Sequence, residues 1–123
     1  MKFLSFSKTL YPLLAGRKTV TRMDWETSYY KKWSAGDKFQ IYDKNPRNGG
    51  KQIGIGKIRT TRSEEADLIL RDKKYGEKEA HMEGFGHKEN PLMALVHTLQ
   101  ERGIDMDSKI YRVHFNVLEI DNG

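Results

Sequence analysis

The feature that most limits the possible folds is a regular alternation near the end of the sequence, over Ile110–Ile120 (IYRVHFNVLEI). From residue 111 to residue 117, large apolar residues alternate with polar ones. The apolar set is Tyr111, Val113, Phe115 and Val117. Successive side chains of a strand point to opposite faces of a sheet. The pattern therefore predicts a long strand with one face packed on a core.

Further strands are predicted upstream. Lys38–Tyr42 alternates in the same way, and a turn-rich segment, NPRNGGK at Asn45–Lys51, separates it from the strand Gln52–Thr60. Two such strands joined by a Gly/Asn turn indicate a hairpin. Ile58 falls out of phase with the isoleucines before it, which indicates a bulge. The composition of Lys2–Phe6 predicts an additional strand.

Short helical segments lie between these strands. Asn90 followed by Pro91 is a typical helix start, and Leu92, Leu95, Val96 and Leu99 follow at helical spacing until Gly103. Other segments are less regular. They are Ser7–Ala15, with Ser7 as N-cap and Leu10, Leu13 and Leu14 facing inward; a turn within Asp24–Ser34; a helix opened by Ser63–Glu65 and running through Leu70; and a turn at Glu77–Glu83.

Strands flanked by short helices indicate an α+β fold, here a partly closed barrel with helices at its ends. The 123 residues contain no repeat or linker, so we expect one domain over 1–123. No apolar run approaches the ~20 residues of a membrane span. The absence of cysteine excludes disulfides and thiolate chemistry and fits the cytoplasm. A net charge of +5 modestly favours polyanionic partners.

The chemistry of the chain is concentrated in Leu13–Arg22, LLAGRKTVTR, where Gly16 stops a helix and cations and threonines follow. Lys18 and Thr21 would face opposite ways on a regular strand, but they can converge on a turn. A threonine hydroxyl needs a base before it acts as a nucleophile. Lysine is such a base only where burial or nearby cations, such as Arg17 and Arg22, lower its pKa. Alternatively, these cations are solvated or bind phosphate.

A second candidate is Glu83, within HMEGF at His81–Phe85. Beside a glycine and an aromatic residue, its carboxylate could close a pocket and bind an exocyclic amine; the alternative is a carboxylate at an exposed helix end. His81 and Glu83 form half of a zinc-deaminase motif, whose cysteine pair this chain lacks. The four histidines show no metal-ligand spacing. We expect neither a metal nor another cofactor.

Aromatic residues are interleaved with lysines just after the motif. Trp25, Tyr29 and Tyr30 precede Lys31, and Trp33 follows. Such a cluster can stack on bases while its lysines contact phosphate, or it can pack into the core. The predicted binding set for substrate or nucleic acid is Arg17, Arg22, Trp25, Tyr29, Tyr30 and Lys31.

The order of these elements resembles the ASCH domain, a small β-barrel related to the PUA RNA-binding fold. The resemblance includes the Gly16–Arg22 motif, the Ala35–Asp37 turn, the strand IGIGKI at Ile53–Ile58, AHMEGF at Ala80–Phe85, and the C-terminal strand. It implies a PUA-like mixed β-barrel with short flanking helices. ASCH proteins do not share one activity.

Within that family, the sequence is most similar to the compact bacterial N4-acetylcytidine amidohydrolases, which use a lysine, a threonine and a glutamate. Matching positions here are Lys18, Thr21 and Glu83. The resemblance implies that Thr21 attacks the acetyl carbonyl, that Lys18 is its base, and that Glu83 orients or protonates the leaving amine. The chain differs by a longer loop at Lys44–Lys51 and by extra residues at Thr61–Gly76.

Two other functions stay open at the level of sequence. One is a non-catalytic RNA-binding module. The other is an ASCH-type ribonuclease, in which Lys18, Glu83 and an arginine act as base, acid and phosphate clamp. In each case the expected partner is a modified nucleoside or RNA, single-stranded rather than duplex, and no membrane is involved.

Overall fold

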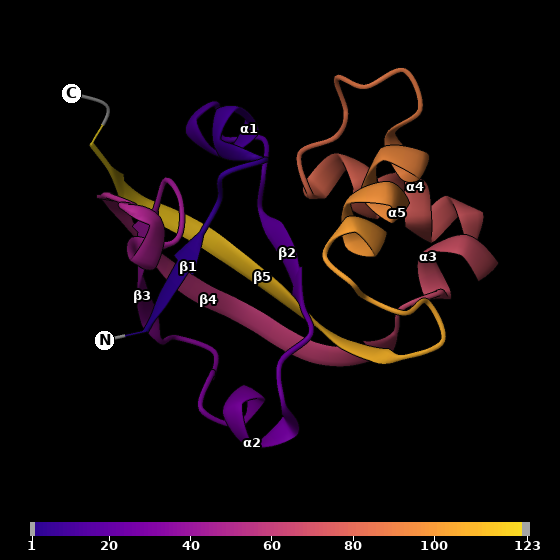
Figure 1. The fold of residues 1–123 in the computed structure, drawn as a ribbon, viewed down its shortest axis with the longest axis horizontal. Coiled ribbons are helices and arrows are strands. Elements are labelled where there is room, and N and C mark those ends of the chain that lie inside the picture. The colour runs from indigo at the N-terminus through magenta and orange to yellow at the C-terminus, as the bar shows by residue number, and fades with distance from the viewer. Residues whose placement is uncertain (1, 122–123) are drawn as a thin grey trace.

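The computed structural model describes residues 2–121 and contains a five-stranded, curled half-barrel sheet flanked by short helices (Figure 1). The strands lie in the order β1 (Phe3–Ser5), β3 (Lys38–Tyr42), β4 (Gln52–Glu65), β5 (Lys109–Ile120) and β2 (Val20–Met23). Strands β1 and β3 are parallel, and the other pairs are antiparallel. The α+β architecture predicted from the sequence is confirmed.

The two longest strands, β4 and β5, run side by side through the middle of the sheet (Figure 1). Their register shifts between Ile55 and Gly56 and again between Ile58 and Thr60, so the predicted bulge is present. A Cβ atom on Gly56 would lie 2.3 Å from the ring of Phe39. Glycine is therefore needed where this ring lies against the strand.

One predicted helix is wrong. Ser63, Glu64 and Glu65 do not open a helix; they extend β4, where they pair with Tyr111, Ile110 and Lys109 of β5. Pairing with the long β5 strand supplies the backbone hydrogen bonds that a helix would have supplied, and the side chain of Glu64 is buried against Arg22. The helix α3 begins only at Leu68.

The concave side of the sheet holds the first apolar core. Phe39 and Ile41 are fully buried there together with Val113 and Phe115, as their alternation predicted. The remaining buried members of this core are Leu4, Phe6, Leu13, Trp33 and Ile58. The half-barrel therefore has an apolar interior.

The first half of the chain contains three short helices, α1 (Leu10–Leu14), α2 (Thr27–Tyr30) and the 3-10 turn η1 (Pro46–Asn48). Helices α1 and α2 lie at opposite ends of the sheet (Figure 1). Helices α3 (Leu68–Arg71), α4 (Lys73–Met82) and α5 (Pro91–Glu101) gather beside one end of β4 and β5 around a second apolar core (Figure 1). None of the helices within residues 2–121 is long and apolar enough to cross a membrane.

Two helix starts can be compared with prediction. The side chain of Asn90 accepts a hydrogen bond from the Met93 amide, which confirms the predicted cap of α5. Helix α1 is shorter than predicted: its N-cap is Thr9 instead of Ser7, and its buried residues are Pro12 and Leu13. Leu14 is 39% exposed because a single turn presents only one narrow face to the core.

Candidate active site

The side chains of Lys18, Thr21 and Glu83 line one pocket of about 290 Å³. The other walls come from the β1–α1 connection, from the segment after α4 and from α5 with its C-cap. They include Phe6, Phe85, Thr98 and Arg102. The structure thus brings the three predicted catalytic residues together around one small cavity.

Lys18 enters this pocket because of how α1 ends. Gly16 has φ +76°, its amide donates to the carbonyl of Leu13, and the Arg17 amide donates to that of Pro12 at 2.8 Å. This pair of bonds is the Schellman ending of a helix, which favours glycine. Directly after it Arg17 is exposed, whereas the side chain of Lys18 is only 3% exposed.

Glu83 is positioned by the same motif at the end of α4. Gly84 has φ +100°, its amide donates to the His81 carbonyl, and the Phe85 amide donates to that of Ala80. A Cβ atom on Gly84 would lie 2.7 Å from the Cβ atom of Pro12. The missing side chain therefore lets the ends of α1 and α4 approach each other, which brings their flanking residues Lys18 and Glu83 into contact.

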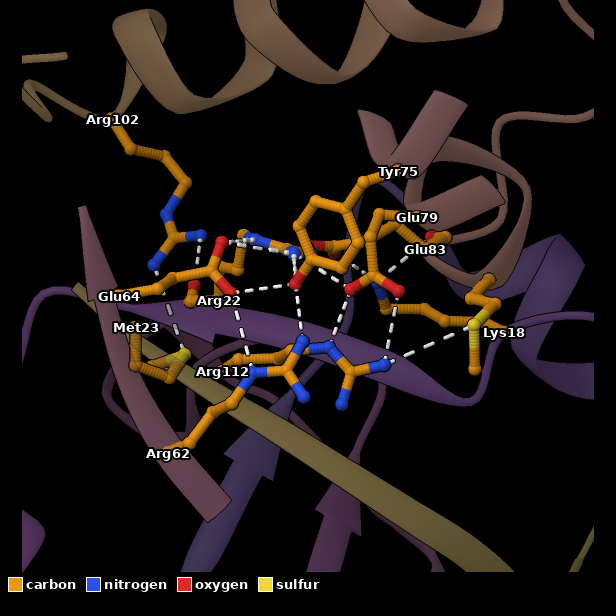
Figure 2. A network of polar contacts seen from close by, with 11 residues as sticks. Lys18, Arg22, Met23, Arg62, Glu64, Tyr75, Glu79, Glu83, Arg102 and Arg112 are labelled. Atoms are coloured by element: carbon orange, nitrogen blue, oxygen red, sulfur yellow. Dashed lines mark hydrogen bonds and ion pairs between the residues drawn. The ribbon is translucent and has the colours of Figure 1, made fainter. Parts of the chain in front are cut away.

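The carboxylate of Glu83 is shared by two cations. Lys18 Nζ donates to Glu83 Oε1 at 3.0 Å and to the Glu83 backbone carbonyl at 2.8 Å (Figure 2). Arg22 Nη1 donates to the other oxygen, Oε2, at 2.9 Å. Because Arg22 takes half of the carboxylate, Lys18 does not have a counter-ion to itself.

This environment favours the neutral amine of Lys18. Burial lowers the pKa of Lys18 below its ordinary value, and the positive charges of Arg102 and Arg22 lower it further. The contacts with Glu83 act in the opposite direction without cancelling burial. The pocket therefore contains a lysine that loses its proton more readily than a lysine in water, as a general base requires.

Thr21 lies on β2, opposite Val113 of β5, and is 8% exposed. Lys18 precedes the first residue of that strand, Val20, so strand alternation does not separate the two side chains. The Thr21 hydroxyl forms no hydrogen bond within residues 2–121. It is free to react with a group in the pocket.

Beneath the pocket lies a layer of buried charges (Figure 2). Arg22 is fully buried, and its Nη2 atom donates to Glu79 at 2.6 Å and to Glu64 at 3.2 Å. Arg112 also binds Glu79, with Nη2 to Oε2 at 3.0 Å. We call this set the charged layer: Lys18, Arg22, Glu64, Glu79, Glu83 and Arg112. It consists of three buried carboxylates and three buried cations.

Two members of the charged layer, Arg22 and Glu79, are held in their charged forms by their neighbours. Burial opposes the charge of Arg22, but the carboxylates of Glu83 and Glu64 outweigh it and raise the pKa of Arg22. Burial likewise opposes the charge of Glu79, whose pKa is nevertheless lowered by hydrogen bonds from Arg112 and Arg22. Arg22, which contacts Glu83, and its partner Glu79 therefore both remain charged.

The structure places two of the predicted binding residues in different environments. Arg22 has no exposed surface, so it cannot contact a substrate directly, and its role is to hold Glu83. Its burial follows from the three carboxylates that surround it. Arg17 is exposed but lines a different pocket, together with His81, Gly84, Gly86 and His87.

The predicted aromatic platform is not part of the pocket. The rings of Trp25 and Trp33 stack at 4.6 Å, and those of Tyr30 and Tyr111 at 3.9 Å. Tyr29 packs edge-on against Trp25, and Lys31 is exposed nearby in sequence. One face of the Trp25 ring is therefore covered by the core residue Trp33, and one face of the Tyr30 ring is covered by Tyr111.

Several residues of the site escaped sequence analysis. Arg102 lines the pocket and donates to the backbone carbonyl of Arg22 at 2.8 Å. Glu64, Glu79 and Arg112 form the charged layer from three separate elements. No local signal marked Arg112, which stands on the polar side of the alternation in β5. In the described residues, no group of three or more His, Cys, Asp or Glu side chains is arranged to hold a metal ion.

Comparison with solved structures identifies the fold. An ASCH domain from Lactobacillus crispatus JV V101 is 19% identical, with a TM-score of 0.58 over 96% of this chain and 80% of that chain. Protein EF3133 from Enterococcus faecalis V583, of family DUF984, is 14% identical, with a TM-score of 0.56 over 91% of this chain and 71% of that chain. No family model and no curated protein matches the sequence. The chain therefore has the fold of ASCH domains.

Proposed function

We propose that this protein is an amidohydrolase that removes an acyl group from the N4 amine of cytosine, with N4-acetylcytidine as the simplest substrate. The observation that carries the proposal is the pocket itself. It holds a buried lysine with a lowered pKa, a threonine hydroxyl without a hydrogen-bond partner, and a fixed carboxylate. These are the components of an activated hydroxyl nucleophile. Lys18 and Thr21 form no hydrogen bond with each other within residues 2–121, so the proposal requires them to approach when substrate binds.

In the first step the neutral amine of Lys18 accepts the proton of the Thr21 hydroxyl, and Oγ1 attacks the acyl carbonyl. The C–N bond then breaks, the acyl group stays on Thr21 as an ester, and the N4 nitrogen leaves as an amine. The proton that this nitrogen needs comes from the Lys18 ammonium. Lys18 is thereby neutral again.

In the second step a water molecule attacks the ester. Lys18 accepts a proton from the water and returns one to Thr21, and the carboxylic acid leaves. Both oxygens of Glu83 accept hydrogen bonds, one from Lys18 and one from Arg22. Of the two roles expected for Glu83, orientation of the amine therefore fits the geometry better than proton donation.

The test is incubation of the pure protein with N4-acetylcytidine and chromatographic detection of cytidine. Lys18→Ala, Thr21→Ala and Glu83→Ala should each abolish most turnover. A double variant should be little slower than a single one, because residues that act as a unit are not additive. Thr21→Ser is the matched control, since it keeps the hydroxyl and should retain activity.

Release of no cytidine at high enzyme concentration would refute the proposal. The same reactions should contain an unmodified single-stranded RNA. Cleavage of that RNA, dependent on Lys18 and Glu83 but not on Thr21, would instead establish a ribonuclease.

A further inference from the structure

A second pocket of about 400 Å³ adjoins the proposed active site. It is lined by Arg17, His81, Gly84, Gly86 and His87. Arg17 directly precedes Lys18, and Gly84 directly follows Glu83, so the second pocket is built from the same two helix ends as the first. The amide of Thr19 donates to the carbonyl of Met82 and ties these ends together.

A third hollow, here called the connecting hollow, shares lining residues with both pockets. It has a volume of about 410 Å³ and shares Lys8, Thr9 and Phe85 with the active pocket. With the second pocket it shares Gly84 and His87. A ligand in the active pocket could extend toward Arg17 over these shared residues.

The chemistry of this surface suits a phosphate group. Neither the second pocket nor the connecting hollow is lined by an acidic residue. Arg17 and Lys88 are exposed and form no ion pair within residues 2–121, whereas Lys8 is paired with Glu101. A guanidinium can bind phosphate through two parallel hydrogen bonds, and histidine ring N–H groups can add further donors.

Glycine keeps the second pocket open. A Cβ atom on Gly86 would lie 2.6 Å from Nδ1 of His81. Any side chain at residue 86 would therefore displace the His81 ring. The backbone forms one wall here, and the ring and the guanidinium form the others.

Resting on the proposed function, we propose that the Arg17 pocket binds a phosphate of the substrate, so that the substrate is a nucleotide unit instead of a free nucleoside. A pocket of about 290 Å³ is at the small end of ligand sites and suits the acylated base alone. The phosphate would belong either to a mononucleotide or to the backbone of a single strand. Tyr11 lines the connecting hollow and is 84% exposed, which offers a stacking surface for a neighbouring base.

The experiment compares Arg17→Ala with Arg47→Ala, which removes the same charge from an exposed arginine outside all three hollows. The substrates are N4-acetylcytidine, its 5′- and 3′-monophosphates, and a short single-stranded RNA with one N4-acetylcytidine. We expect Arg17→Ala to reduce kcat/KM about tenfold or more for a phosphate-bearing substrate. For the nucleoside it should leave kcat/KM unchanged, and Arg47→Ala should match the wild type on every substrate.

The substrates also identify the source of the phosphate. A loss confined to the RNA assigns the pocket to a backbone phosphate; a loss with one monophosphate assigns it to that end of the nucleotide. For the RNA, the slope of log K against log salt should fall by about 0.7 in Arg17→Ala, as expected for one lost phosphate contact on a single strand. Equal losses with nucleoside and phosphate-bearing substrates would overturn the proposal.

Binding separates this proposal from the proposed function. If no substrate is hydrolysed, cytidine, cytidine 5′- and 3′-monophosphates and a fluorescent single-stranded RNA are titrated against the same variants. Tighter binding of a phosphate-bearing ligand than of cytidine, lost in Arg17→Ala alone, would support a phosphate site without amidohydrolase activity. If affinity depends neither on the phosphate nor on Arg17, the phosphate site is refuted even if the nucleoside is hydrolysed.

Discussion

The two buried regions on either side of the sheet are built from opposite chemistry. The half-barrel interior is apolar, with Phe39, Ile41 and Phe115 at its centre. The charged layer lies between the sheet and α4 and is almost equally inaccessible to water, yet Arg22, Glu79 and Arg112 are its main components. Apolar burial stabilises a fold directly, whereas burial of an ion pair often contributes little once desolvation is included.

The contrast indicates that the charged layer serves the site more than it serves stability. It positions Arg22 so that its guanidinium binds one oxygen of Glu83. Lys18 therefore shares its counter-ion with Arg22, whose positive charge also contributes to the lowered pKa of Lys18. An apolar layer of the same volume would hold α4 on the sheet as well. It would not give Lys18 these neighbours.

The largest expected effect is that of removing Arg22. Arg22→Ala leaves Glu64, Glu79 and Glu83 buried without their common partner, so we expect the free energy of unfolding to fall by about 3–5 kcal/mol. Chemical denaturation measures this loss of stability. Arg71→Ala, at an exposed arginine, is the control and should cost little. A similarly small loss in Arg22→Ala would show that the charged layer is not a coupled unit.

A smaller effect is expected at Gly16, which links the charged layer to α1. Gly16→Ala forces alanine to a φ of +76° in open space and should cost about 1 kcal/mol. Gly36→Ala, at φ +92° and also in open space, should lose the same stability. Only Gly16→Ala should also lose activity, because Lys18 lies two residues away. Equal activity in the two variants would mean that the end of α1 does not position Lys18.

The next prediction concerns pH. The wild-type kcat/KM for deacylation should rise with pH as the Lys18 ammonium loses its proton. Arg102 lowers the pKa of Lys18, so Arg102→Gln should raise it and move the rising limb to higher pH. Arg47→Gln should not shift the pH at which kcat/KM rises. A limb that stays fixed in Arg102→Gln would exclude Lys18 as the titrating base.

The smallest expected change in stability is that of replacing Lys18, and it tests most closely whether the charged layer serves the site more than it serves stability. Lys18→Met should abolish deacylation but leave the free energy of unfolding at pH 7 within about 1 kcal/mol of the wild type, because burial of the ammonium offsets its contact with Glu83. The folded pKa of Lys18 lies below its unfolded value. The wild type should therefore gain stability relative to Lys18→Met as the pH rises from the folded pKa toward 10.5.

The sequence predicted the apolar half of this comparison better than the charged half. Phe39, Ile41, Val113 and Phe115 follow strand alternation, and a two-residue period needs no knowledge of the partner strand. Gly16 was correctly expected to end a helix, because its Schellman motif is formed by local backbone bonds.

The charged layer could not be predicted because its partners come from distant elements. Glu64 was interpreted as part of a helix start, and Arg22 as a ligand contact, since a single charged residue usually faces water. Arg22 is buried only because Glu64, Glu79 and Glu83 converge on it from 42, 57 and 61 residues away in the sequence. Resemblance to a known family, and not local pattern, brought Lys18, Thr21 and Glu83 together in the prediction.

The most direct test of the central claim is an NMR titration of the Lys18 side chain, followed through lysine labelled with ¹³C at Cε and assigned by its loss in Lys18→Met. We expect a pKa for Lys18 below the ordinary value of 10.5, and a higher pKa in Arg102→Gln. A wild-type pKa at or above 10.5 would contradict the role of Lys18 as base, because Lys18 would then remain charged and could not activate Thr21.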